Sequence, residues 1–217
     1  MIKNKSEVKR INKIFALLKN EYPNTKPQLD YSNPFELLIA TILSAQCTDK
    51  RVNEVTVSLF ARYKSTTDYA SAHIKELESI IRPTGFYHNK AKAIIDSCKM
   101  LCHAYDGKVP SSMEELIKLP GVGRKTANVV LGGAFGMDTI AVDTHMLRVS
   151  KRLGLTISTN PEIVERDLMD AIPVVDWTRF NMALILHGRE TCKARRPLCG
   201  ECILFIECRW VDKNKYI

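Results

Sequence analysis

The chain has 217 residues, of which 45% are hydrophobic and 26% charged, and its formal net charge is +8 at pH 7. These proportions exclude a disordered chain, and no apolar run reaches the ~18 residues of a membrane span. The basic excess favours a polyanionic partner, either a nucleic acid or a membrane surface. The polar N-terminus has no signal-peptide core, so we expect a cytoplasmic protein without a disulfide framework.

Helical patterns follow one another along the chain, and no stretch shows the sustained alternation of a half-buried strand. Asn33 followed by Pro34 is a strong helix start, and residues 37–43 are apolar nearly all round, as expected of a buried central helix. The patterns predict an all-α protein with helices over 6–20, 33–43, 48–62, a short one from 67, 74–81, 88–105, 111–119, 124–136, 143–153, 160–172 and 177–186.

Residues 119–131 join two of these helices through a turn that contains two glycines. Pro120 ends the first helix, and Gly121 and Gly123 permit backbone conformations that side chains disfavour. The second helix starts at Arg124 and points free N–H groups, at the positive end of its dipole, out of the turn. The glycine spacing excludes the common nucleotide-binding loops. The pattern indicates a helix-hairpin-helix that can hold an anion; an ordinary corner between helices is the alternative.

A cysteine cluster lies near the C-terminal end of the chain. It consists of Cys192, Cys199, Cys202 and Cys208. Four thiolates this close can bind a tetrahedral zinc ion or an iron–sulfur cluster. The cysteines are separated by one short and two long intervals. Such spacing suits a chain that wraps around a group larger than a single ion, so it favours the iron–sulfur cluster over zinc. The other three cysteines stand in apolar helical segments, where we expect buried free thiols.

The loop between the first two clustered cysteines is basic. It carries Lys193, Arg195 and Arg196. Positive charges on a loop braced by a metal site suit contact with phosphate groups. A solvated surface loop would carry the same charges.

Taken together, these motifs resemble the helix-hairpin-helix superfamily of DNA glycosylases, from about residue 33 to residue 208. The resemblance also includes the segments 37–46, 85–91, 142–145 and 186–189. It implies two helical domains with a DNA cleft between them. Residues 23–137 would form a six-helix barrel containing the hairpin, and residues 1–22 with 138–217 an iron–sulfur domain. It further implies that the four clustered cysteines hold a 4Fe-4S cluster.

The resemblance assigns the catalytic roles to Lys125 and Asp143. An amine nucleophile can form a Schiff base at the sugar, which then permits β-elimination of the 3′ phosphate. We expect partial burial, the neighbouring Arg124 and the helix N-terminus to favour the neutral amine of Lys125. Asp143 is also the expected cap of the helix after it, which would keep its carboxylate ionised beside a positively charged sugar. The alternative is that Lys125 only contacts phosphate.

A base that is extruded from the duplex leaves a gap, and the resemblance assigns the filling of that gap to Gln46 and Phe86. An aliphatic residue is commoner than phenylalanine at the second position. The two histidines of the shared segments, His145 and His187, are expected to be structural. The remaining expected DNA contacts lie in the hairpin and in the basic loop: Gly121, Val122, Gly123, Arg124, Lys193, Arg195 and Arg196.

The resemblance therefore implies a monomeric base-excision repair enzyme with no membrane association. It would release oxidised or damaged pyrimidines from double-stranded DNA and cleave the strand at the abasic site. Two alternatives stay open. A monofunctional glycosylase that removes adenine from mismatches usually lacks a lysine at position 125 and carries an extra C-terminal domain. A non-catalytic DNA-binding scaffold would not need Lys125, Asp143 and the four cysteines together.

Overall fold

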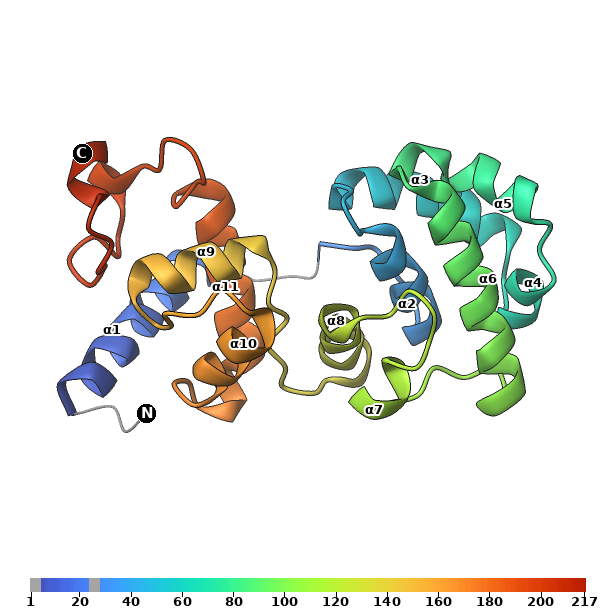
Figure 1. The fold of residues 1–217 in the computed structure, drawn as a ribbon, viewed down its shortest axis with the longest axis horizontal. Helices are drawn as coiled ribbons and strands as arrows, with labels where there is room; N and C mark the ends of the chain where they lie inside the picture. The colour runs from blue at the N-terminus through green and yellow to red at the C-terminus, as the bar shows by residue number, and fades with distance from the viewer. Residues whose placement is uncertain (1–4, 24–27) are drawn as a thin grey trace. The chain divides into compact units, whose positions relative to one another are not determined.

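The computed structural model describes residues 5–23 and 28–217, and this part of the chain is helical, without a strand (Figure 1). The prediction of an all-α protein is confirmed. The chain divides into two compact units: residues 27–137, called here the central unit, and residues 1–26 with 138–217, called the terminal unit. The two ends of the chain therefore belong to the same unit.

The central unit is built around one buried helix. Its elements are α2 (Pro34–Leu43), α3 (Asp49–Arg62), α4 (Thr66–Ala70), α5 (Ile74–Ile81), the 3-10 turn η1 (Arg82–Thr84), α6 (Tyr87–Ala104), α7 (Met113–Leu116) and α8 (Arg124–Phe135). Every residue from Leu37 to Leu43 in α2 is buried, and α2 packs against α3, α6 and α8. The prediction of a buried central helix is confirmed, because an all-round apolar helix gains most by contacting neighbours on every side.

Side-chain caps begin two of these helices, α2 and α3, where the sequence predicts them. The Asn33 side chain accepts a hydrogen bond from the Glu36 amide at 2.9 Å, and Thr48 caps α3. The predicted start of α4 at Thr67 is wrong. Ser65 caps this helix, and the Asp68 side chain completes a capping box by accepting from the Ser65 amide at 3.0 Å.

Helix α7 differs from its prediction at both ends. Ser112 caps it by accepting from the Glu115 amide at 3.3 Å, and the helix ends at Leu116 instead of reaching Leu119. The amides of Lys118 and Leu119 bond to carbonyls three residues back. A proline at position 120 disfavours helical backbone in the residue before it, so the chain tightens into turns.

The hairpin is held against α6 by a close contact. Gly121 has φ +77°, and a Cβ on it would lie 2.7 Å from the Cβ of Ala93. The Ser97 hydroxyl donates to the Pro120 carbonyl at 2.6 Å, and Val122 is buried in the central core. Gly121 is thus required inside the protein, both by its left-handed backbone and by its nearness to α6.

The second hairpin glycine has no such internal requirement. Gly123 caps α8 with extended backbone, φ −91° and ψ 174°, which any residue can adopt. A Cβ there would meet no protein atom within 4 Å. The space beside Gly123, at the N-terminus of α8, is therefore open to a molecule outside the chain.

The terminal unit joins both ends of the chain around one core. Its elements are α1 (Lys5–Glu21), α9 (Thr144–Leu153), α10 (Pro161–Met169), η2 (Val174–Asp176), α11 (Trp177–Glu190), η3 (Cys199–Glu201) and η4 (Lys213–Tyr216). Helix α11 packs against α1 and α9. The apolar stripe of α1 is buried in this core, and the Arg10 guanidinium donates to the carbonyls of Leu153 at 2.8 Å and Glu207 at 2.7 Å.

Two helix ends in this unit differ from prediction. Helix α10 ends at Met169, not at residue 172, because Pro173 disfavours helical backbone just before it. Helix α11 runs beyond residue 186 to Glu190. It continues through Gly188 because the missing side chain gives α9 room: a Cβ on Gly188 would lie 3.0 Å from the Cβ of His145.

All seven cysteines are free, as predicted. Of the three outside the cluster, Cys98 is buried, but Cys47 and Cys102 are only half-buried. The expectation of burial is therefore wrong for those two. Within residues 5–23 and 28–217, no helix is both long and apolar enough to cross a membrane.

The two hairpin glycines should respond differently to serine. Gly121→Ser should lower the free energy of unfolding by about 1–3 kcal/mol, because it adds left-handed strain and a clash with Ala93. Gly123→Ser should change it by less than about 0.5 kcal/mol, because serine is a good N-cap on extended backbone. Urea unfolding followed by circular dichroism measures both. Equal losses at the two positions would contradict this assignment.

Candidate active site and iron–sulfur centre

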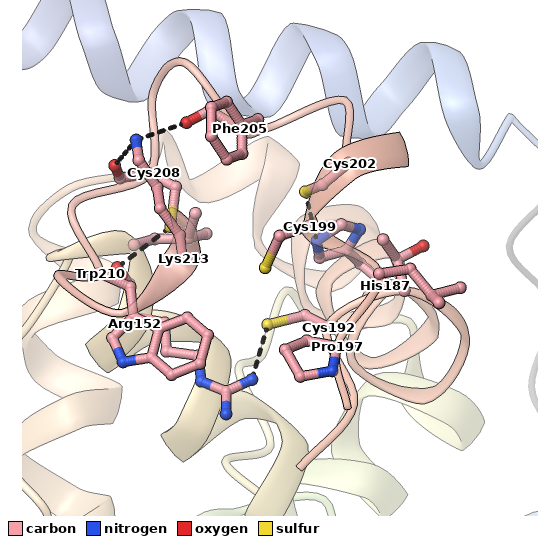
Figure 2. A pocket seen from close by; sticks show the side chains of 13 residues that line it. Arg152, His187, Cys192, Pro197, Cys199, Cys202, Phe205, Cys208, Trp210 and Lys213 are labelled. Atoms are coloured by element: carbon pink, nitrogen blue, oxygen red, sulfur yellow. Dashed lines mark hydrogen bonds between the residues drawn. The ribbon is translucent and has the colours of Figure 1, made fainter. Parts of the chain in front are cut away.

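The four clustered cysteines face one cavity in the terminal unit (Figure 2). The cavity contains about 350 Å³ of space, open solvent included. In the part of the chain that the structure describes, no three His, Cys, Asp or Glu side chains are placed to hold a single metal ion. All four cysteines line this one cavity. Four thiolates that line one space can hold a sulfur-bound metal group.

Two cationic side chains close the walls of this cavity. The Arg152 guanidinium donates to the Cys192 sulfur at 3.4 Å and lies 3.9 Å from the ring centre of Trp210. The Lys213 ammonium donates to the carbonyls of Phe205 and Cys208, each at 2.7 Å. Positive groups at these places offset the negative charge of bound thiolates.

Burial changes the acid–base behaviour of the cavity wall. Burial raises the pKa of the Cys202 thiol to about 11, and it also raises the pKa values of the Cys199 and Cys208 thiols. A metal centre must therefore displace thiol protons when it binds, as thiolate sites do. Burial also lowers the pKa of His187 to about 4. Its imidazole is therefore neutral at pH 7, and its Nε2 lies 3.7 Å from the Cys202 sulfur.

The basic loop is braced at its base and open at its tip. Arg152 donates to the carbonyls of Lys193 at 2.8 Å and Ala194 at 3.2 Å. The side chains of Lys193, Arg195 and Arg196 are all exposed. The loop therefore presents its positive charges to solvent from a fixed base, an arrangement that suits contact with a phosphate backbone.

Lys125 lies in the first turn of α8, directly after Gly123 and Arg124, and its side chain is exposed. The expectation that Lys125 is partly buried is wrong. The amine is accessible to a molecule that approaches the open space in front of Gly123.

Asp143 caps α9 as predicted. Its carboxylate accepts from the Met146 amide at 2.8 Å, and the residue is half-buried. Asp143 belongs to the terminal unit and Lys125 to the central unit.

Helix α9 also carries two arginines that the sequence reading passed over. Arg148 donates to the Gly188 carbonyl at 2.7 Å and to the Cys192 carbonyl at 3.0 Å, and it lies 3.2 Å from His145 Nδ1. Arg152 follows one turn later and contacts the same cysteine. Their spacing of four residues places both on the face of α9 opposite its buried residues, and this pairing is the signal that could have identified them.

The two residues predicted to fill a gap in DNA share an unusual backbone. Gln46 has φ +53° and Phe86 has φ +50°, and both side chains are exposed, Phe86 by 61%. In the described residues only two other non-glycine residues have positive φ: Asp106 and Arg196. Three of these four are predicted DNA contacts. Strain of this kind gathers at functional sites, where the surroundings hold it in place.

Comparison with known proteins agrees with this picture. Residues 39–174 match the HhH-GPD superfamily of base excision DNA repair proteins. Residues 192–205 match the iron–sulfur binding domain of endonuclease III, a range that includes three of the four clustered cysteines and ends before Cys208. The first match covers more than half of the chain.

Individual relatives cover nearly the whole chain. Endonuclease III of Synechocystis is 52% identical over 200 residues, which are 92% of this chain and 91% of that protein. The solved structure of a non-covalent endonuclease III–DNA complex superposes with a TM-score of 0.91 at 46% identity, over 96% of this chain and 97% of that one. A trapped endonuclease III–DNA covalent intermediate matches equally well. The resemblance seen in the sequence is thus confirmed, and the chain belongs to the endonuclease III family of the HhH-GPD superfamily.

Proposed function

We propose that this chain cleaves damaged DNA through Lys125 as nucleophile and Asp143 as the charge-balancing carboxylate. As a member of the endonuclease III family, the chain is a base-excision DNA glycosylase and abasic-site lyase. The observation that carries the residue assignment is the exposed amine of Lys125 in the first turn of the hairpin helix. A relative of 46% identity forms a trapped covalent intermediate with DNA, as an amine nucleophile would.

The hairpin places this amine beside a phosphate site. The first amides of α8 are at the positive end of the helix dipole, and the space in front of Gly123 is open. A DNA phosphate bound there would leave the Lys125 amine within reach of the neighbouring sugar. The neutral amine attacks C1′ as the bond between C1′ and the base breaks, and the base leaves with a proton. The nitrogen loses a proton and the C1′–O4′ bond opens, which gives the Schiff base. The Schiff base acidifies the C2′ proton, whose loss expels the 3′ phosphate.

Asp143 supports this reaction by charge. The sugar becomes positively charged as the bond to the base breaks, and a nearby ionised carboxylate lowers the energy of that state. The N-cap bond to the Met146 amide orients the carboxylate. The same carboxylate can accept a proton during Schiff-base formation.

The DNA interface that we propose combines the hairpin, the basic loop and the two exposed corners of the chain at Gln46 and Phe86, where the backbone is left-handed. Phosphates would contact the hairpin backbone around Val122, and the exposed cations of the basic loop. Gln46 and Phe86 would occupy the gap that the extruded base leaves. We further propose that oxidised pyrimidines are the bases removed, that a monomer acts on double-stranded DNA in the cytoplasm, and that the central and terminal units are separate folding domains.

The chain carries the family's iron–sulfur domain, and we propose that Cys192, Cys199, Cys202 and Cys208 each bind one iron of a 4Fe-4S cluster. The four sulfurs that face one cavity support this assignment. When bound, the cluster supplies a covalent cross-link between four points of a segment that has little regular structure of its own. Arg152 and Lys213 then orient this segment and balance its charge.

Borohydride trapping tests the nucleophile. On duplex DNA with an abasic site, the unsubstituted protein should form a covalent adduct, because borohydride reduces the Schiff base. Lys125→Ala should form none, whereas Lys99→Ala, which removes an exposed lysine from α6, should trap normally. Gel electrophoresis under denaturing conditions measures the adduct. An adduct with Lys125→Ala would refute the assignment.

Two substitutions at Asp143 separate its two roles. Asp143→Asn should unfold at the same urea concentration as the unsubstituted protein, because asparagine is an equally good N-cap. Its rate of base release should nevertheless fall by about 100-fold, because the charge is lost. Asp143→Ala should lose activity and also about 0.5–2 kcal/mol of stability. Full activity of Asp143→Asn would show that only the cap matters.

Iron content tests the cluster ligands. Cys202→Ser should lose most of its iron and its broad visible absorption, because one of four thiolates is missing. Cys102→Ser, a half-buried cysteine outside the cavity, should retain both. Metal analysis by mass spectrometry and visible spectroscopy give the result. Zinc without iron in the unsubstituted protein, or full iron in Cys202→Ser, would contradict the proposed ligand set.

A further inference from the structure

One buried lysine of the central unit has no part in the chemistry above. Lys90 lies near the start of α6, and only 5% of its surface is exposed. Its ammonium donates to the Leu43 carbonyl at 2.7 Å and to the Thr84 carbonyl at 2.8 Å. Among the residues that the structure describes, no carboxylate pairs with it. A buried cation of this kind is costly unless its hydrogen bonds are made, and burial lowers the pKa of Lys90.

Both carbonyls that Lys90 contacts end a helical element. Leu43 is the last residue of α2 and Thr84 the last residue of η1. Carbonyls at a helix C-terminus lack a partner within the helix and carry its negative dipole end, so an ammonium suits them. A single side chain therefore ties together the ends of α2 and η1 and the start of α6.

The chain turns into an exposed corner directly after each of these two carbonyls. Gln46 stands three residues after Leu43, and Phe86 stands two residues after Thr84. These are the two left-handed residues assigned to gap filling. The Lys90 amide also donates to the Phe86 carbonyl at 3.1 Å. Lys90 thus contacts one corner through its backbone and anchors both through its side chain.

Left-handed backbone in residues other than glycine persists only where neighbouring contacts hold it. No side-chain cap bond holds Phe86 at the start of α6, and Gln46 is exposed. The buried ammonium is the contact that both corners share. We infer that Lys90 is a positioning residue that sets the two corners so that Gln46 and Phe86 enter the duplex together. This inference rests on the gap-filling role given to these residues in the proposed function.

The test compares Lys90→Met with Lys99→Met. Methionine keeps the length of the side chain but cannot donate, and Lys99 is an exposed lysine on the same helix. In Lys90→Met, amides of residues 44–47 and 85–87 should exchange with deuterium about tenfold faster or more, because local opening is no longer restrained. Residues of α3 should exchange at the same rate in both variants.

The functional readout is base release from a duplex that contains thymine glycol, measured in a single turnover. Lys90→Met should be slower than Lys99→Met by about tenfold or more, because misplaced side chains fail to stabilise the extruded state. Affinity for undamaged duplex should be the same in both, because phosphate contacts are intact. A merely destabilised protein would lose both properties together.

A third measurement needs no substitution. In the unsubstituted protein, nuclear magnetic resonance of ¹⁵N-labelled lysine should show one ammonium group that exchanges slowly with solvent, and Lys90→Gln should remove it. Absence of this signal, unchanged exchange at the corners, or equal base release in the two methionine variants would each overturn the inference. Failure of the proposed function is seen separately, as failure of the unsubstituted protein to trap abasic DNA.

Discussion

Helix α9 links the proposed catalytic carboxylate to the proposed metal centre. Asp143 caps its first turn. Arg148 and Arg152, one turn apart further along, donate to the carbonyl and the sulfur of Cys192. Because a helix is stiff over three turns, the position of the cysteine segment and the position of the carboxylate depend on each other. A loss of order around the cysteines would therefore reach Asp143 through ten residues of regular structure.

The two glycines of the hairpin look equivalent in the sequence, but the structure gives them different surroundings. Gly121 lets the turn lie against α6, where no side chain would fit. Gly123 faces open space, so nothing inside the protein requires its lack of a side chain. The first holds the N-terminus of α8 in place, and the second leaves that N-terminus accessible. A phosphate site needs both properties, because a mobile or covered helix end would bind an anion poorly.

In the central unit, two exposed residues with strained backbone lie close in the chain to carbonyls that a buried lysine binds. Gln46 and Phe86 adopt backbone conformations that cost free energy, yet each follows directly on a helical element whose last carbonyl is bound by a buried lysine. The terminal unit repeats this arrangement at Arg196, which also has positive φ and stands on a loop braced by Arg152. In both units, exposed residues proposed to contact DNA stand shortly after carbonyls that a cationic side chain binds.

Local chemistry explains what the sequence alone determined. Helix starts depend on a capping side chain and an amide two or three residues away, so Asn33, Thr48 and Asp143 were predicted correctly from neighbouring residues. The cysteine spacing and the residues of the hairpin are likewise local, and they were enough to indicate the family. Where a serine earlier or later in the same run could cap equally well, as at Ser65 and Ser112, the prediction missed the start by one or two residues.

Only the tertiary structure decided the features that join residues far apart in the chain. The exposure of Lys125, the path of α11 through Gly188, and the contacts of Lys90, Arg148 and Arg152 each depend on elements tens of residues away. Periodicity also does not show that α1 and the last eighty residues share one core. An apolar stripe indicates that a helix packs against something, but it does not identify the partner. The sequence determined which groups are present, and long-range packing decided what surrounds them.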